Sequence, residues 1–293
     1  MQGIINLKIL KHKRRIYMEL QLLLNTIRNM VKIGTNIEAK ETQKGTRTLT
    51  GIMIGDKNNV FTPVVYMEYY EDLFQEKGYE AVAREMIKTC QNAEVLDVNL
   101  IEITSLDYAK NNLMLCISPA RTNNGNVTIP YLDLELYFRV IIDGGTYTVT
   151  ELMMGSWGIT KEELLEIATN NSTYTVKSME DILRELVEDS YDDFLEVPQE
   201  YRQTVITNEL QNYGASALYN KTLLKEIADK FNDDLCIMPS SIHEIIVIPM
   251  NVIPSKENVD SMIKEINELE VRPEERLSDH AYVFHRDTME IEW

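Results

Sequence analysis

The apolar residues of this chain come in short runs, and the length of these runs limits what the chain can fold into. The longest run, Ile245–Met250, has only the length of a β-strand, whereas a bilayer-spanning helix needs about 20 apolar residues. Segments with apolar residues at three- and four-residue spacing alternate with strand-like segments, and turn residues separate them. This alternation predicts a globular protein in which helices pack on sheets, and no membrane-spanning helix is expected.

The clearest alternation lies in the last part of the chain. The expected order there is strand, helix, strand, strand, helix, strand, strand, and the segments are Thr204–Thr207, Thr222–Phe231, Leu235–Met238, Glu244–Ile248, Ser255–Leu269, Ala281–His285 and Thr288–Glu292. Short connections favour antiparallel neighbours. We therefore expect an α+β fold of mixed, mostly antiparallel sheets covered by helices, arranged in two lobes.

The upstream sequence predicts a first helix from Leu20 to Val31, followed by a hairpin around Lys44-Gly45. Two helices are expected on either side of Gly78, a natural helix stop. Thr160 and Ser178 each precede a carboxylate by three residues, so each is expected to cap a helix. The segments expected in this region are Thr35–Glu41, Thr46–Ile54, Val60–Met67, Glu68–Gln75, Tyr79–Cys90, Leu113–Ile117, Leu132–Ile142, Thr146–Thr150, Lys161–Thr169 and Met179–Val187.

A concentration of acids marks the expected domain boundary. Nine acids and one base, Arg184, lie between Glu180 and Glu200, which is typical of a solvated helix end and linker. Recruitment of a basic partner or Ca²⁺ is the alternative, although D-x-D-x-D-G spacing is absent. The expected parts are a basic, disordered N-terminal extension over 1–17, an α/β region over 18–197 and a C-terminal α+β domain over 198–293.

The net charge of −18 limits the classes of partner. Residues 1–17 carry five cations and no acid, so the remaining body is still more acidic. Such a body repels nucleic-acid phosphates and suits a basic protein partner. The cations follow the apolar residues of this segment, which is the reverse of the order in a signal peptide. Three interpretations of the segment remain: a disordered tail, a docking or targeting arm, or a natural start of the protein at Met18.

Three cysteines, Cys90, Cys116 and Cys236, are far apart and form no C-x-x-C pair. This pattern favours a reducing, cytoplasmic location and buried thiols over nucleophiles or zinc ligands. H-E-x-x-H and the glycine-rich phosphate motifs are absent, and His280 and His285 fall on opposite faces of a strand. We expect neither a metal nor another cofactor.

Three polar segments are expected to meet at one end of the C-terminal sheet. They are Thr207-Asn208 with Gly214–Ser216, Pro239–Glu244, and Ser278–His280. Ser241, His243 and Asp279 are the residue types of a nucleophilic hydrolase, although the spacing is unspecific and a hydrogen-bonded turn explains Ser241 and His243 equally. Further candidate ligand-binding residues are Asn208, Ser216, Ser240, Glu244 and His280.

Several of these strings together resemble a bacterial family of uncharacterised proteins, domain of unknown function 5688. The strings are Val205–Asn208, Tyr213–Leu218, Asp234–Glu244, Leu277–His280 and, upstream, Trp157–Leu164. The resemblance extends from about Met18 over nearly all of the chain, and Pro239–Glu244 is its most specific part. It implies a bacterial or mobile-element origin and a cytosolic protein, and it supplies no catalytic residue.

Two functions follow as hypotheses. The acidic body and the missing catalytic motifs favour a non-enzymatic binding or regulatory protein with a basic partner, of which charge mimicry of DNA is a special case. The alternative is a hydrolase or small-ligand site at Ser241, His243 and Asp279. The sequence does not determine the oligomeric state.

Overall fold

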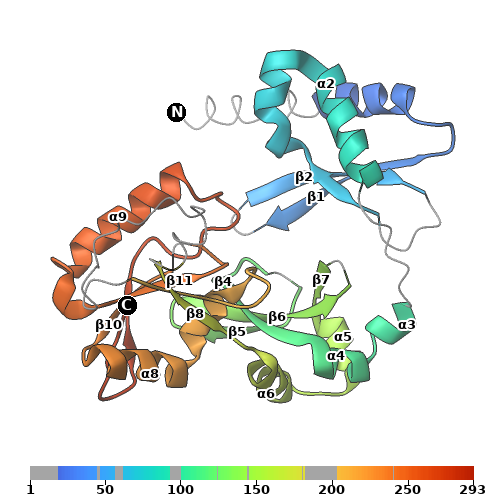
Figure 1. The fold of residues 1–293 in the computed structure, drawn as a ribbon. Coiled ribbons are helices and arrows are strands. Elements are labelled where there is room, and N and C mark those ends of the chain that lie inside the picture. The colour runs from blue at the N-terminus through green and yellow to red at the C-terminus, as the bar shows by residue number, and fades with distance from the viewer. Residues whose placement is uncertain are drawn as a thin grey trace, which may run out of the picture. The chain divides into compact units, whose positions relative to one another are not determined.

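The computed structural model describes residues 19–44, 47–56, 62–92, 100–123, 125–143, 145–179, 181, 203–239 and 241–293 (Figure 1). By its internal contacts the chain divides into two compact units. The first comprises Met1–Gln43 with Thr48–Leu100, and the second comprises Lys44–Arg47 with Ile101–Trp293.

The first unit is a small sheet with helices packed on it. Its described elements are a helix over 19–30, β1 (Asn36–Lys44), β2 (Arg47–Gly55), β3 (Val64–Tyr66), the 3-10 helix η1 (Met67–Tyr70) and α2 (Glu71–Asn92), with strand order β1-β2-β3. Leu23 and Ile27 from the first helix and Met86 from α2 share the buried core. The two helices expected on either side of Gly78 are confirmed within α2, because the helical backbone is interrupted at Gly78 (φ 75°, ψ −174°). Glycine adopts this φ without strain.

The second unit contains a four-stranded and a six-stranded sheet. The four-stranded sheet has the order β4-β6-β5, with β7 also paired to β6, and the six-stranded sheet has the order β13-β12-β10-β11-β9-β8. The elements are α3 (Leu100–Ile103), α4 (Leu106–Asn112), β4 (Leu113–Pro119), β5 (Thr128–Tyr131), β6 (Leu134–Ile142), β7 (Gly145–Thr148), α5 (Glu151–Trp157), α6 (Lys161–Asn171), β8 (Thr175–Ser178), β9 (Thr204–Thr207), η3 (Gly214–Tyr219), α8 (Lys221–Phe231), β10 (Leu235–Met238), β11 (Ile245–Pro249), η4 (Met250–Val252), α9 (Lys256–Leu269), β12 (Tyr282–Phe284) and β13 (Ile291–Glu292).

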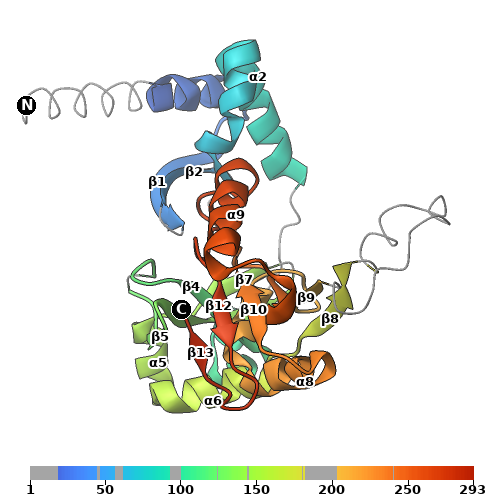
Figure 2. The ribbon, with the colours of Figure 1, turned by 90° about the vertical axis from the view of Figure 1, so that its left-hand side faces the viewer.

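Strict alternation along β10 explains why α8 and α9 lie on opposite faces of the six-stranded sheet (Figure 2). Successive strand residues point to opposite faces. Leu235 and Ile237 join the core beneath α8, whereas Cys236 and Met238 pack with Val259 of α9. Both faces of β10 are therefore apolar. A strand covered on both sides is expected to be a continuous hydrophobic run in the sequence, and β10 is such a run.

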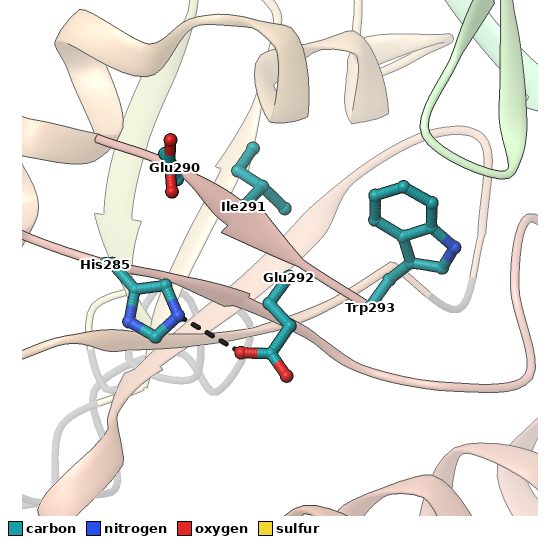
Figure 3. Close-up of a pocket in the computed structure, with 5 residues that line it drawn as sticks. All are labelled: His285, Glu290, Ile291, Glu292 and Trp293. Carbon is teal, nitrogen blue, oxygen red and sulfur yellow. Dashed lines mark hydrogen bonds and ion pairs between the residues drawn. The ribbon is translucent and has the colours of Figure 1, made fainter. Parts of the chain in front are cut away.

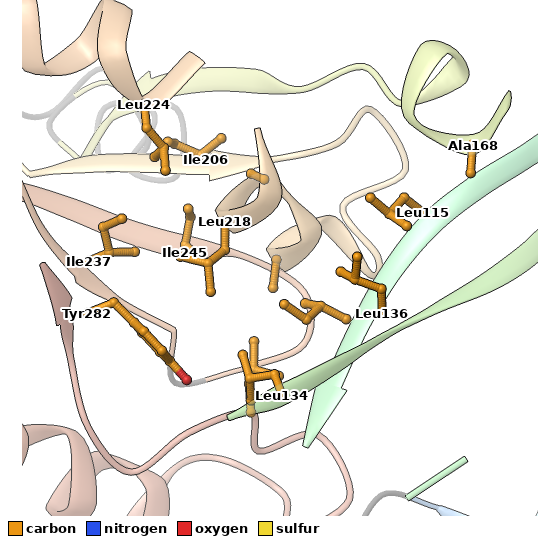
Figure 4. Packing of buried hydrophobic residues seen from close by; sticks show 14 of the residues in the cluster. Leu115, Leu134, Leu136, Ala168, Ile206, Leu218, Leu224, Ile237, Ile245 and Tyr282 are labelled. Carbon is orange, nitrogen blue, oxygen red and sulfur yellow. The ribbon is translucent and has the colours of Figure 1, made fainter. Parts of the chain in front are cut away.

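The main core is shared by both sheets of the second unit (Figure 4). Leu115 and Leu136 from the four-stranded sheet belong to the same buried cluster as Ile206, Ile237 and Ile245 from the six-stranded sheet. A domain boundary is expected near residue 197, but the segments before and after it pack into this one core. The division into compact units falls near Leu100. The boundary itself lies outside the described residues.

The α+β class with mostly antiparallel sheets is confirmed, since every strand pair with a described register is antiparallel. Thr160 forms the expected capping box with Glu163. Ser178 accepts a hydrogen bond from the Asp181 amide, but most of the helix expected after it lies outside the described residues. Within the part of the chain that the structure covers, no helix combines the length and apolarity needed to cross a membrane.

Candidate functional site

The three polar segments converge at one end of the six-stranded sheet, around a turn of residues 241–244 that we call the His243 turn. Thr207 Oγ1 donates a hydrogen bond to the His243 carbonyl oxygen at 2.8 Å. On the other side, the Ile242 amide donates to the Glu275 carbonyl oxygen at 2.8 Å. The Ser278 amide donates to the Pro239 carbonyl oxygen at 3.2 Å. Backbone and side-chain hydrogen bonds therefore hold the three segments together.

Gly214 is required where two of these segments touch. A Cβ atom at this position would lie 2.5 Å from Thr207 Oγ1, 2.6 Å from the Asn208 nitrogen and 2.7 Å from the His243 carbonyl oxygen. No real Cβ packs so closely, so only glycine admits this approach of backbone to backbone. The neighbouring Tyr213 has φ 62°, an uncommon conformation for a residue with a side chain.

Ser241 uses its hydroxyl within the His243 turn. The side chain is buried, at 6% exposure. Its Oγ donates to Glu244 Oε1 at 2.7 Å and accepts from the His243 amide at 3.1 Å. Among the described residues no hydrogen bond joins this hydroxyl to an imidazole. The pattern is that of a serine stabilising a tight turn.

His243 presents its imidazole as a donor. The Tyr213 amide donates to Nδ1 at 3.4 Å, so the neutral ring carries its proton on Nε2. Nε2 in turn lies 3.8 Å from Glu275 Oε1. The ring packs beside Tyr213 with centroids 5.9 Å apart, and the Arg139 guanidinium lies 4.6 Å from the centre of that tyrosine ring. A general base accepts a proton through a free nitrogen lone pair, but here Nε2 of His243 already carries a proton.

Asp279 belongs to a different network from Ser241 and His243. Its Oδ1 accepts from Asn267 Nδ2 at 2.7 Å, and the same amide group donates to the Ser278 carbonyl oxygen at 2.9 Å. Asn267 is buried on α9, at 1% exposure. Asp279 thus fastens α9 to the chain before β12. The three hydrolase candidates lie near one another along the fold without forming a linked triad.

His280 pairs with Asp133, a residue that no sequence pattern singles out. His280 Nε2 lies 2.9 Å from Asp133 Oδ2, and Nδ1 lies 3.1 Å from the Ala281 carbonyl oxygen. Tyr282 donates its phenol proton to Asp133 Oδ1 at 2.6 Å, and burial followed by this hydrogen bond raises the pKa of Tyr282. Both ring nitrogens of His280 thus face acceptor oxygens. The group ties the turn between β5 and β6 to β12, joining the two sheets.

The remaining candidates also serve local structure. Asn208 closes a loop by accepting from the Asn212 amide at 3.1 Å and donating to the Asn212 carbonyl oxygen at 2.7 Å. Ser216 is buried at 1% exposure and contacts the Tyr174 hydroxyl at 3.2 Å. Glu244 holds Ser241, and Ser240 lies outside the described residues. These contacts give each described candidate a stabilising role.

The outer flank of α9 is an apolar surface that folding leaves unexplained. Met262, Ile266 and Leu269 are 43%, 40% and 72% exposed, and their spacing places them in one row along the helix. Val259 and Ile263 meanwhile bury the inner face. We call this row, Met262 with Ile266 and Leu269, the α9 flank.

The α9 flank is set on a well-anchored, acid-rich helix. Ser255 caps its first turn by accepting from the Asn258 amide. Asp260 accepts from the Ala281 amide at 2.7 Å, and Asn267 holds the last turn. The exposed acids around the C-terminal half are Glu265, Glu268 and Glu270.

A model of a protein family matches residues 20–286, which is most of the chain. The chain belongs to the family of unknown function DUF5688. Comparison with curated proteins and with solved structures gave no match. Membership confirms the resemblance carried by the His243 turn and its neighbouring segments.

In this DUF5688 member all three cysteines are buried. Burial raises the pKa of Cys116 to about 12 and that of Cys236 to about 11, and burial also raises the pKa of Cys90. A thiol with a raised pKa is a poor nucleophile at neutral pH. Across the described residues, no three His, Cys, Asp or Glu side chains are grouped so that they could hold a metal ion.

Proposed function

We propose that this protein is a non-enzymatic binding protein that recognises a basic amphipathic helix of a protein partner through the α9 flank. The single observation that carries the proposal is the exposed row of Met262, Ile266 and Leu269 on a helix whose opposite side is already packed. Helices commonly recognise helices through apolar anchors with this spacing.

The apolar part of the surface supplies affinity. Covering large apolar side chains that are 40–72% exposed removes them from water, and burying one such side chain fully is worth about 1.5–3 kcal/mol. Ser255, Asp260 and Asn267 already fix the helix, so little conformational entropy is lost on binding. The α9 flank therefore supports association without a large ordering cost.

Charge selects the partner. Glu265 lies three positions from Met262 and four from Leu269, and Glu270 lies four positions from Ile266, so these two acids adjoin the α9 flank. Lys264 lies two positions from both Met262 and Ile266 and faces another way, next to Glu268. The net charge of −18 adds a long-range field of the same sign. Such a field speeds association with cations and repels phosphates and acidic proteins.

The occupied hydroxyl and imidazole groups support binding over catalysis. Ser241 is buried and its hydroxyl donates a hydrogen bond to Glu244. His243 directs an N–H toward Glu275, where a hydrolase needs an acceptor nitrogen. Both ring nitrogens of His280 face acceptor oxygens, those of Ala281 and Asp133. The residue types that suggested a hydrolase are thus explained by folding.

A model peptide tests the proposal directly. A labelled amphipathic helix of about four turns, built from leucine and lysine, is titrated against the full chain by fluorescence anisotropy. We expect saturable binding that weakens as NaCl rises from about 0.05 to 0.5 M, and at least about tenfold weaker binding to Met262→Ser/Leu269→Ser. The Glu265→Gln/Glu270→Gln variant should bind more weakly at low salt only.

Two controls separate specific from general adhesion. Leu152→Ser alters an 83% exposed leucine on α5 of the same unit and should leave binding unchanged. A leucine–glutamate peptide should not bind. Equal binding of the leucine–lysine peptide by Met262→Ser/Leu269→Ser and by the wild type would refute the assignment to α9.

A further inference from the structure

The outermost strand of the six-stranded sheet, β13, is held by few interactions. Its two residues, Ile291 and Glu292, pair with β12. Beside this short ladder, the His285 amide donates to the Glu290 carbonyl oxygen at 2.9 Å, and Ile291 packs against the main core as a partly buried side chain. Elements with so few buried contacts open with small free energies. One further contact is then enough to shift the pairing of β13.

That further contact comes from the imidazole of His285 (Figure 3). Nδ1 lies 2.8 Å from Oδ2 of Asp234, which precedes β10, and Nε2 lies 3.3 Å from Oε2 of Glu292 in β13. Figure 3 shows the Glu292 carboxylate turned back to the ring, whereas the Trp293 indole extends to the other side of the strand. An ionised carboxylate only accepts hydrogen bonds. Both contacts are therefore satisfied together only when the ring carries a proton on each nitrogen.

Loss of one of these protons removes the contact with Glu292. Asp234 lies closer to the ring, and its side chain is 38% exposed, compared with 73% for Glu292. The Arg286 amide also donates to Asp234 Oδ1 at 2.8 Å, which fixes that carboxylate beside Nδ1. The neutral ring therefore keeps its proton on Nδ1 and turns the lone pair of Nε2 toward Glu292. The attraction that held Glu292 is then replaced by repulsion.

The charged groups around His285 are mostly acidic. They come from α8, from the segment before β10, from β13 and from the turn that contains His285, and they are Lys225, Asp229, Asp233, Asp234, Glu290, Glu292, Arg286 and Asp287. Both cations are already paired, because Asp229 lies 2.8 Å from Arg286 and also accepts from Lys225. The hydrogen bond to Asp234 raises the pKa of His285 above its ordinary 6.5. The ring is thus protonated below pH 6.5 and loses its proton as the pH rises through the higher folded-state pKa.

We propose that β13 is a pH-sensitive edge strand, which pairs with β12 while His285 is an imidazolium and separates from it when the ring becomes neutral. The inference does not rest on the α9 flank, and either can fail without the other. Loss of an exposed ion pair should raise the population of the separated strand by roughly two- to fivefold. Separation leaves the outer edge of β12 with unpaired backbone groups, which are a template for pairing with another strand.

NMR of the full chain measures the ring and the strand separately. The Cε1–H signal of His285, identified by its loss in His285→Gln, gives the protonation of the ring from about pH 5.5 to 9. The Cα and Cβ shifts of Ile291 and Glu292 report whether β13 is a strand. We expect these shifts to move from strand values toward coil values with the midpoint of the His285 titration. Shifts that stay constant through that titration would overturn the proposal.

Two matched variants assign the effect to the contact between His285 and Glu292. A glutamine side chain both donates and accepts hydrogen bonds, so Glu292→Gln should satisfy either form of the ring, and Ile291 should keep its strand shifts across the titration. Asp287→Asn removes an exposed acid from the turn after β12 and should retain the transition of β13, with the midpoint moved slightly to lower pH. An unchanged transition in Glu292→Gln would contradict the proposal, because His285 would then act through another contact.

Discussion

Replacing Gly214 by alanine should destabilise the second unit through the contact that builds the His243 turn. The new Cβ would lie 2.5–2.7 Å from three atoms, of which the Asn208 nitrogen and the His243 carbonyl oxygen belong to the backbone. Backbone atoms cannot rotate away as a side-chain end can. The segments must separate, and the 2.8 Å hydrogen bond from Thr207 to His243 is stretched with them.

The expected loss follows from two opposing effects. Overpacking costs about 1–3 kcal/mol, and weakening one hydrogen bond adds about 1 kcal/mol. Alanine also restricts the unfolded chain, which returns about 0.4–1 kcal/mol. The net loss is about 1–3.5 kcal/mol, and for a unit of this size the melting temperature should fall by roughly 2–14 °C.

Tryptophan emission during thermal or urea unfolding reports on the second unit, because Trp157 and Trp293 both lie in it.

Gly155→Ala is the matched control. Gly155 lies in α5, and a Cβ there meets no atom within 4 Å, so the same substitution should stabilise by about 0.5–1 kcal/mol. A melting temperature for Gly214→Ala at or above that of the wild type would refute the steric reasoning.

Four further outcomes are expected. The hydrogen bond to Asp234, followed by that to Glu292, raises the pKa of His285 above its ordinary 6.5. The stability from this pairing is complete below pH 6.5 and is lost as the pH rises through the folded-state pKa. The urea midpoints of the wild type and His285→Asn should therefore converge at alkaline pH. Thiol titration with a disulfide reagent at about pH 8 should detect no cysteine in the native chain and all three in denaturant, because the three thiols are buried; fast native labelling would contradict that burial. Thr160→Ala should lower unfolding stability by about 1 kcal/mol, since Thr160 and Glu163 cap α6 reciprocally, while no loss in a urea titration would count against the capping box. A fluorophosphonate probe should label wild type no more than Ser241→Ala, because the Ser241 hydroxyl is buried and donates to Glu244; specific labelling would restore the hydrolase hypothesis.

Much of the fold could be predicted where hydrophobic period and turn residues agree. The strands and helices after Thr204 match the expected segments within a few residues, because β10 and β11 are short apolar runs and α8 and α9 are strongly amphipathic. The helix α5 and the edge strands β5 and β8 were missed. Thr175–Ser178 is exposed on its central residues, so it carries no hydrophobic pattern that would identify a strand.

The meeting of the polar segments at one sheet end could also be predicted, since consecutive antiparallel strands bring their ends together. The side chains that contact the candidate residues could not be predicted. Asp133 reaches His280 from 147 positions away, and Arg139 reaches the Tyr213 ring from β6. Such contacts depend on how two sheets share one core, and no local pattern in the sequence records that packing.

The most specific string of the family resemblance, Pro239–Glu244, is explained by the requirements of folding. Pro239 accepts the Ser278 amide, Ser241 and Glu244 hold each other, and His243 receives hydrogen bonds from Thr207 and Tyr213. A turn whose backbone and side-chain groups are so fully used tolerates few substitutions whether or not it touches a ligand. The string therefore identifies the fold and carries no evidence of catalysis. The α9 flank, which folding leaves unused, lies elsewhere on the second unit, and it is there that we expect members with the same turn to differ in what they bind.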